Sequence, residues 1–150
     1  MRSELHVEIR APFDRVFDLA AGVERWPELL PHYRYVRRLP SADGERRFAM
    51  GARRGPIPVT WEAIQRPDRS DRRIEFVHTG GVTRGMWVAW RFADRPDGAL
   101  DVSIEHRLTL GWPLIGDLVA RHVIGPQFIE AIAGRTLRRV KQLAEAPTDA

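Results

Sequence analysis

The sequence predicts an α+β domain in which one curled antiparallel sheet is covered by a long C-terminal helix. Residues 32–110 form short segments of alternating apolar and polar side chains separated by local turns, which is typical of antiparallel strands. After Trp112-Pro113 the apolar spacing changes to the period of a helix. A sheet of about six to seven strands has to curl and needs one face covered, so we expect the helix to pack against it.

The composition fits one globular domain. Of 150 residues, 43% are hydrophobic and 29% charged, which is too apolar for a disordered chain. We expect a single domain over residues 1–145 and a flexible tail over 146–150. No apolar run is long enough to span a membrane and no signal peptide is evident, so we expect a cytoplasmic protein. Cysteine is absent, which excludes disulfides and thiolate chemistry.

The basic charge does not predict nucleic-acid binding. The net charge is +4, and Lys141 is the only lysine among 24 basic residues. The arginines are dispersed among 20 acidic residues, and pairs such as Arg53-Arg54 fall in predicted strands, where neighbouring side chains point to opposite faces. No continuous basic face results, so we expect no nucleic-acid partner.

The N-terminal segment predicts a strand followed by two short helices. Residues 3–10 alternate between apolar and polar side chains, as a half-buried strand does. Pro12 stands at a helix start, apolar residues follow at helical spacing, and Gly22 ends that helix. A second short helical turn is expected over Val23–Leu30.

About six consecutive strands are expected between His32 and Leu110. Turn residues at 42–44, 55–56, 67–71, 80–81 and 96–98 separate them. Within each strand, the residues predicted to share a face are Tyr33, Tyr35, Arg37 and Leu39; Phe48 and Met50; Ile57, Val59, Trp61, Ala63 and Gln65; Ile74, Phe76 and His78; Val82, Arg84, Met86, Val88, Trp90 and Phe92; and Val102, Ile104, His106, Leu108 and Leu110.

The C-terminal helix carries one stripe that should face the sheet. Pro126 falls within it, so a kink or break is expected near Gly125. The apolar segment Trp112–Ile124 predicts either simple packing or a lid over a cavity mouth. The stripe consists of Leu118, His122, Ile129, Ile132, Thr136, Val140 and Leu143.

This order of elements resembles the helix-grip fold of the START-like (SRPBCC) superfamily. The resemblance is carried by Ala11–Asp18, by Val23–Tyr33, by Trp90-Arg91-Phe92 and by Leu137–Leu143, and so covers nearly the whole chain. The Trp26-Pro27-Glu28-Leu29 stretch is its most specific part. The chain looks similar to the polyketide cyclase/dehydrase branch, which includes aromatase/cyclases and coenzyme-Q-binding START-type proteins. The resemblance implies a ligand cavity between sheet and helix, but the superfamily mixes enzymes, binding proteins and carriers.

Two cavity positions follow from the resemblance to aromatase/cyclases. Their cavity includes a tyrosine after the Trp-Pro motif, and Tyr33 matches that position. It also includes an arginine on the strand after the third turn, where this chain has Gln65, with the outward-pointing Arg66 next to it. A neutral amide hydrogen-bonds a polyketone oxygen but lacks the charge of a guanidinium. This departure weakens the expectation of polyketide cyclisation and leaves ligand binding intact.

Several polar residues are candidates for cavity groups. His106, on an apolar strand face, and His122, on the helix stripe, are each either a hydrogen-bonded core histidine or a ligand anchor. Together with Tyr33 they are the candidate acid–base residues. Arg84 is either an exposed strand end or a cation at the cavity mouth for a carboxylate or phenolate. Tyr35 either packs or hydrogen-bonds a ligand through its hydroxyl.

Aromatic and apolar residues complete the candidate site. Trp61 and Trp90 are either core residues or a flat wall against a planar ligand. The histidines show no metal-ligand spacing and no glycine-rich phosphate loop is present, so we expect neither a metal nor a cofactor. The full set of predicted ligand contacts is Tyr33, Tyr35, Phe48, Met50, Trp61, Gln65, Arg84, Met86, Trp90, His106, His122 and Ile132.

Three functions are compatible with these residues. The first is binding of a small hydrophobic, aromatic or polyketide-like molecule in a cavity of roughly 300–1,000 Å³. The second is an enzyme of the same fold that cyclises, dehydrates or aromatises a polyketide. The alternative is a non-catalytic lipid or quinone carrier that contacts a membrane surface peripherally. Both a monomer and a homodimer remain open.

Overall fold

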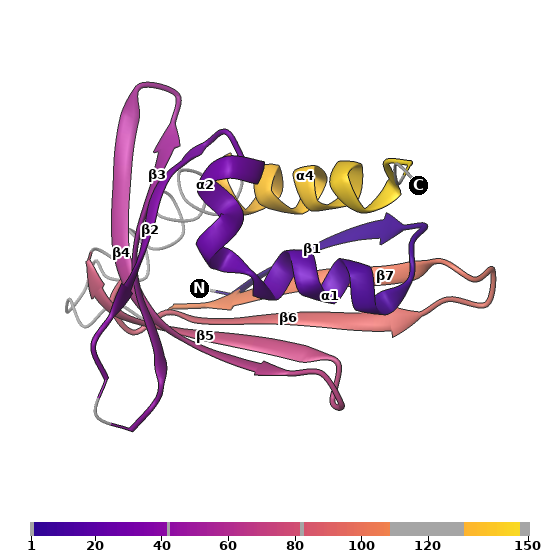
Figure 1. Cartoon of the computed structure of the whole chain (residues 1–150), viewed down its shortest axis with the longest axis horizontal. Helices are drawn as coiled ribbons and strands as arrows, with labels where there is room; N and C mark the ends of the chain where they lie inside the picture. Colours follow the sequence, from indigo (N-terminus) through magenta and orange to yellow (C-terminus); the bar gives the residue numbers. More distant parts are fainter. Residues whose placement is uncertain (1, 42, 82, 109–130, 148–150) are drawn as a thin grey trace.

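A computed structural model describes residues 2–41, 43–81, 83–108 and 131–147 of the chain. Its strands form one antiparallel sheet in the order β1-β7-β6-β5-β4-β3-β2, and this sheet is strongly curved (Figure 1). The predicted α+β class with a curled antiparallel sheet is therefore confirmed. The strands are β1 (Arg2–Ile9), β2 (Tyr33–Leu39), β3 (Arg46–Arg54), β4 (Ile57–Asp68), β5 (Arg73–Gly81), β6 (Trp87–Asp94) and β7 (Leu100–Arg107).

The two short N-terminal helices lie where the sequence signals place them, and the described part of the C-terminal helix begins at Gly134. Helix α1 (Phe13–Ala21) starts after Pro12 and ends at Gly22. A 3₁₀ turn (Val23–Arg25) leads into the single-turn helix α2 (Trp26–Leu29), and α4 (Gly134–Glu145) follows a wider, π-type turn over residues 131–133. Within the described ranges, no helix is long and apolar enough to cross a membrane.

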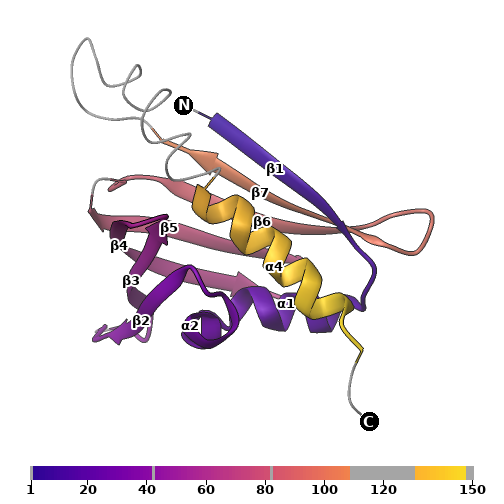
Figure 2. The same ribbon diagram turned by 90° about the horizontal axis from the view of Figure 1, so that it is seen from above.

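Helix α4 lies across the inner face of the sheet, with α1 beside it (Figure 2). The first strand forms one edge of the sheet and pairs with the last strand, which brings Val7 opposite Val102. The guanidinium of Arg15 donates hydrogen bonds to the carbonyls of Leu143, at 3.2 Å, and Ala146, at 2.9 Å. These bonds fix the end of α4 against α1 and therefore against the sheet.

The interior contains aromatic side chains along most of its length. Under α1, the rings of Phe13, Phe17 and Phe92 lie with centroids 5.4–5.6 Å apart. Beyond them, Trp90 lies 6.4 Å from Phe92 and 6.3 Å from Trp26. The Phe cluster fills the space between α1 and the sheet, so a cavity has to lie further along, towards α2 and the start of α4.

A bulge in β2 makes the predicted orientation of Tyr35 wrong. The β2–β3 register shifts between Tyr33 and Tyr35, so Tyr33 pairs with the inward-facing Ala52, whereas Tyr35 pairs with Gly51. The Tyr35 ring covers Gly51 on the outer face, where a Cβ atom at position 51 would overlap it. Beyond the bulge, Val36 takes the inward position opposite Met50. The extra residue reverses the alternation, which a local sequence pattern does not reveal.

The predicted tight turn at Gly80-Gly81 is also wrong. Strand β5 continues to Gly81, and the connection to β6 lies over residues 82–86. A register shift opposite Gly80-Gly81 and the positive φ of Gly81 let the strand continue, and Gly85, with φ of 92°, closes the turn. Arg84 is exposed in this connection, which settles its position in favour of the solvent.

Several predictions fall on residues that the structure does not describe. They are the orientation of His122, the break near Gly125, the lid alternative for Trp112–Ile124 and the end of the tail. These lie outside the described residues, and so do Val82 and Leu110.

Candidate functional site

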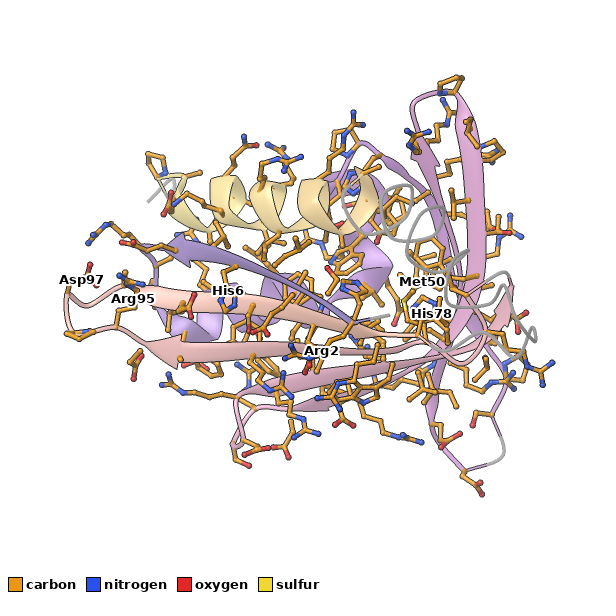
Figure 3. The ribbon with its side chains drawn as sticks, turned by 180° about the vertical axis from the view of Figure 1, so that it is seen from behind. Arg2, His6, Met50, His78, Arg95 and Asp97 are labelled. Carbon is orange, nitrogen blue, oxygen red and sulfur yellow. The ribbon has the colours of Figure 1, made fainter. Side chains whose placement is uncertain are left out.

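A pocket lies between the inner face of the sheet and the start of α4. Its volume is about 50 Å³, smaller than the roughly 300–1,000 Å³ expected for a ligand pocket. Figure 3 shows two of its residues, Met50 of β3 and His78 of β5, close together. The residues that line it are Trp26, Tyr33, Met50, Trp61, Phe76, His78, Val88, Trp90, Ile104, His106, Ile132, Ala133 and Thr136.

Strand register brings the pocket residues of the sheet together. Phe76 of β5 pairs with Val88 of β6, which pairs in turn with His106 of β7, so these three side chains form one row across the inner face. Trp90 and Ile104 belong to the next row. Because alternate residues of a strand face the same side, both rows project towards α4.

Aromatic rings form most of the pocket wall and explain its small volume. The Trp26 ring lies 5.0 Å from Tyr33, and the Tyr33 ring lies 6.0 Å from Trp61. The Trp61 indole stacks on His78 with ring planes only 4° apart. The Trp26 indole nitrogen donates a hydrogen bond to the carbonyl of Leu19 at 3.0 Å, which fixes the orientation of that ring. The rings occupy much of the space that was predicted to be empty.

Thr136 joins two neighbouring side chains at the start of α4. Its hydroxyl donates to the carbonyl of Ile132 at 2.8 Å and accepts a hydrogen bond from Nε2 of His32 at 2.9 Å. Burial lowers the pKa of His32 to about 4. Burial also raises the pKa of Tyr33 far above its usual value, and a hydrogen bond with Thr136 only partly opposes this. Tyr33 therefore presents a neutral phenol to the pocket.

His78 is held in a fixed orientation beside the pocket. Its Nδ1 lies 2.7 Å from Oγ1 of Thr83, a buried residue of the β5–β6 connection. Burial, and secondarily the proximity of His106, lower the pKa of His78 to about 3. Its imidazole is therefore neutral at physiological pH.

His106 is the pocket residue with an unmade hydrogen bond. Its side chain is only 2% exposed, and among the described residues its Nδ1 has no hydrogen-bond partner. Burial lowers its pKa to about 4, so this imidazole is neutral as well. His106 thus lines the pocket, and one nitrogen of its buried ring makes no hydrogen bond within the described part of the chain.

The structure brings half of the predicted contact residues together. Tyr33, Met50, Trp61, Trp90, His106 and Ile132 line the pocket. The predicted set missed Trp26, Phe76, His78, Val88, Ile104, Ala133 and Thr136. The alternation of side chains already placed Phe76, His78, Val88 and Ile104 on shared strand faces, and the helical spacing placed Thr136 on the helix stripe. The sequence could not show which cross-strand rows of side chains contact the helix.

Of the other predicted contacts, His122 lies outside the described residues and the remaining five lie away from the pocket lining. The Gln65 amide donates to the carbonyl of Ala21 at 2.9 Å and accepts from Nε of Arg46 at 2.8 Å. It therefore hydrogen-bonds the C-terminal end of α1. Phe48 is fully buried, with the guanidinium of Arg46 5.4 Å from its ring centre. Met86 is buried in the β5–β6 connection, outside the lining. Tyr35 packs on the outer face and Arg84 lies in solvent, so for both residues the structure favours the alternative to ligand contact.

Comparison with known proteins gives a consistent family assignment. A family model described as polyketide cyclase/dehydrase and lipid transport matches residues 9–124. A granaticin polyketide synthase bifunctional cyclase/dehydratase from Streptomyces violaceoruber is 28% identical over 111 residues, which cover 73% of this chain and 34% of that protein. The corresponding actinorhodin protein from Streptomyces coelicolor is 30% identical over 99 residues, which cover 65% and 31%. This chain thus spans about a third of the length of these curated relatives.

A solved structure supports the fold independently. The aromatase/cyclase Zhui from a Streptomyces species superposes with a TM-score of 0.80, over 97% of this chain and 93% of that one. The sequence identity of the pair is 20%, so the likeness concerns the fold. It agrees with the helix-grip arrangement expected from the sequence.

Proposed function

The chain belongs to the polyketide cyclase/dehydrase and lipid transport family, in the START-like superfamily, and on this basis we propose that it binds a small polyketide-like molecule in the pocket and acts on it as a cyclase/dehydratase. The observation that carries the proposal is the Nδ1 of His106, which has no hydrogen-bond partner among the described residues and belongs to a side chain that lines an aromatic pocket. The family match alone supports the reaction class, whereas His106 supports this pocket as the site.

The energetics of His106 favour a ligand role. A buried polar group without a hydrogen bond costs about 1–3 kcal/mol, and a leucine at the same position would avoid that cost. The inner face of β7 is otherwise apolar around it, with Ile104 and Leu108 on either side, so packing alone does not require a histidine. An oxygen of the ligand supplies the missing partner.

The pocket's polar groups suit proton transfer between neutral species. An aldol-type closure moves one proton from a methylene carbon to the carbonyl oxygen that becomes a hydroxyl, and it forms one carbon–carbon bond without a leaving group. The dehydration that follows removes that hydroxyl and a neighbouring proton as water. A neutral imidazole accepts a proton at one nitrogen and donates one from the other, so His106 is our candidate for the proton carrier. Tyr33 hydrogen-bonds the oxygen that gains negative charge.

Ligand size separates this proposal from the lipid or quinone carrier. A long acyl or isoprenoid chain needs several times the space of a ring system, and the pocket offers about 50 Å³ before any side chain moves. A small aromatic ligand needs less rearrangement of Trp61, Trp90 and Met50.

The test uses benzoylacetone, an aromatic 1,3-diketone, as a binding probe in calorimetry. His106→Leu should weaken binding roughly tenfold, because one hydrogen bond of about 1.4 kcal/mol is lost. Tyr33→Phe should weaken binding, and because the Tyr33 hydroxyl also hydrogen-bonds Thr136, stability should fall by no more than about 1 kcal/mol. Tyr35→Phe is the matched control: it removes the same hydroxyl from the outer face and should leave affinity unchanged.

Turnover is measured separately with a short linear polyketone thioester, by mass-spectrometric detection of the loss of one water. The wild type should dehydrate it, and His106→Leu should not. If the wild type and His106→Leu bound the diketone with the same affinity, this pocket would not be the binding site.

A further inference from the structure

The described part of the pocket wall carries no formal charge at neutral pH. None of the described lining residues is Asp, Glu, Lys or Arg. The polar lining residues are Tyr33, His78, His106 and Thr136, and burial disfavours the charged form of each of the three that titrate. The described part of the wall therefore offers hydrogen bonds and apolar contacts, and none of its residues is an ionic partner.

Three described arginines on β3 and α4, two elements that line the pocket, are hydrogen-bonded or exposed. Arg46, which reaches the interior from β3, donates to the Gln65 side chain, and that amide in turn holds the carbonyl of Ala21. On α4, Arg135 and Arg138 flank the buried Thr136 but both point into solvent. None of these guanidinium groups belongs to the pocket lining.

The wall also favours flat ligands. The indole of Trp61 and the imidazole of His78 are parallel to within 4°, and the ring of Trp90 lies on the same inner face. Parallel rings present a flat apolar surface, against which an aromatic ring packs better than a branched aliphatic group.

We propose that the pocket selects uncharged, planar ligands with a ketone or phenol oxygen, and excludes the same frame when it carries a carboxylate. This inference rests on the proposed function and narrows its substrate class. A buried carboxylate without a counter-charge loses its hydration and gains no ion pair, whereas a ketone loses far less and regains a hydrogen bond from His106. Carboxylate intermediates or products would accordingly be rejected or released.

Three probes of one ring system test the inference at pH 7.5 by calorimetry: naphthalene, 2-acetylnaphthalene and 2-naphthoate. The last two have nearly the same shape, because an anionic oxygen replaces a methyl group. We expect the ketone to bind roughly 100-fold or more tightly than the carboxylate, and naphthalene to bind between them. In His106→Leu, the ketone should lose its advantage over naphthalene.

A charge placed in the pocket should reverse the selection. Met50→Lys puts an ammonium group on the pocket wall, and 2-naphthoate should then bind at least roughly tenfold more tightly than to the wild type. Tyr35→Lys, on the outer face, is the matched control and should change neither affinity.

The outcomes separate this inference from the proposed function. Binding of 2-naphthoate as tight as that of the ketone overturns the charge selection and leaves the pocket as a binding site. Exclusion of 2-naphthoate that persists in a folded Met50→Lys variant which still binds the ketone also overturns it, because shape would then be the cause. Failure of all three probes to bind the wild type overturns both proposals together.

Discussion

Glu105 and His106 are neighbours on β7, and they occupy opposite sides of the sheet. Both side chains are 2% exposed and both are titratable. On the outer face, Glu105 accepts hydrogen bonds from Arg2 at 2.5 Å, from Arg91 at 3.0 Å and from Arg107 at 3.1 Å. On the inner face, the Nδ1 of His106 has no partner among the described residues.

The pKa values of the two groups follow from this difference. Burial by itself would raise the pKa of Glu105, but the hydrogen bonds and charges of the three arginines lower it to about 2. Burial lowers the pKa of His106 to about 4 with no opposing partner. Glu105 is therefore charged and satisfied, and His106 is neutral and unsatisfied.

The comparison sets a polar residue that joins strands of the sheet beside one for which we propose a role in ligand binding. The arginines around Glu105 come from β1, β6 and β7, so the carboxylate joins three strands of the sheet. Within the described ranges, the Nδ1 of His106 has no partner, whereas the Nδ1 of His78 is paired with Thr83. We infer that Glu105, on the outer face, stabilises the fold and that His106, on the inner face, binds a ligand.

The largest expected effect is a loss of stability in mild acid. His32, His78 and His106 have folded-state pKa values of about 4, 3 and 4, against 6.5 for an unperturbed histidine. Below pH 6.5 these histidines become protonated in the unfolded chain but stay neutral in the folded protein. The free energy of unfolding therefore falls as the pH drops from 6.5 towards 4. The slope is at most about 1.4 kcal/mol per pH unit for each histidine. Urea denaturation at pH 7.5, 6 and 5 measures it.

The contribution of Glu105 falls in a different pH window. Its folded-state pKa of about 2 lies below the unperturbed 4.5, so its stabilisation is complete above pH 4.5 and is lost as the pH falls towards 2.

His106→Leu should reduce the slope of stability against pH between pH 6.5 and 4 by the contribution of one histidine. A wild-type stability that stays constant from pH 7.5 to 5 would contradict the assignment of neutral buried histidines.

The second largest effect is expected for Glu105→Gln. The amide keeps the shape but loses the charged hydrogen bonds, so the free energy of unfolding at pH 7.5 should fall by roughly 2 kcal/mol. Glu8→Gln, a control at a more exposed ion pair with Arg10, should change it by less than about 0.5 kcal/mol. Benzoylacetone affinity should be unchanged in both variants. If Glu105→Gln weakened benzoylacetone binding, the outer face would contribute to ligand binding as well as to stability, and the proposed separation of roles would be wrong.

The smallest effect, and the one opposite in sign, is expected for His106→Leu. Removing an unsatisfied buried group should raise the free energy of unfolding at pH 7.5 by about 1 kcal/mol. His78→Leu is the matched control, because it leaves Oγ1 of Thr83 without its partner and should destabilise the protein. If His106→Leu destabilised the fold as much as His78→Leu does, His106 would be a structural residue.

The sequence alone determined the fold class and much of the inner face. Side chains alternate with a period of two along a strand, so Trp61, His78, Trp90 and His106 could be assigned to shared faces before any pairing was known. The Trp-Pro motif located Tyr33 through family resemblance, and the structure places that residue in the pocket. These features depend only on local order along the chain.

Tertiary structure decided the rest, because strand partners and side-chain packing are not encoded in a local pattern. The β2–β3 pairing sets the bulge that turns Tyr35 outwards, and the β5–β4 pairing lets β5 run past Gly80 and leaves Arg84 in solvent. Contact between aromatic rings from separate elements reduces the cavity to about 50 Å³. Pairing of the first strand with the last brings Arg2 to Glu105, 103 residues away along the chain. A two-residue period records which side of a strand a residue faces, but only the assembled sheet determines which distant residue stands opposite it.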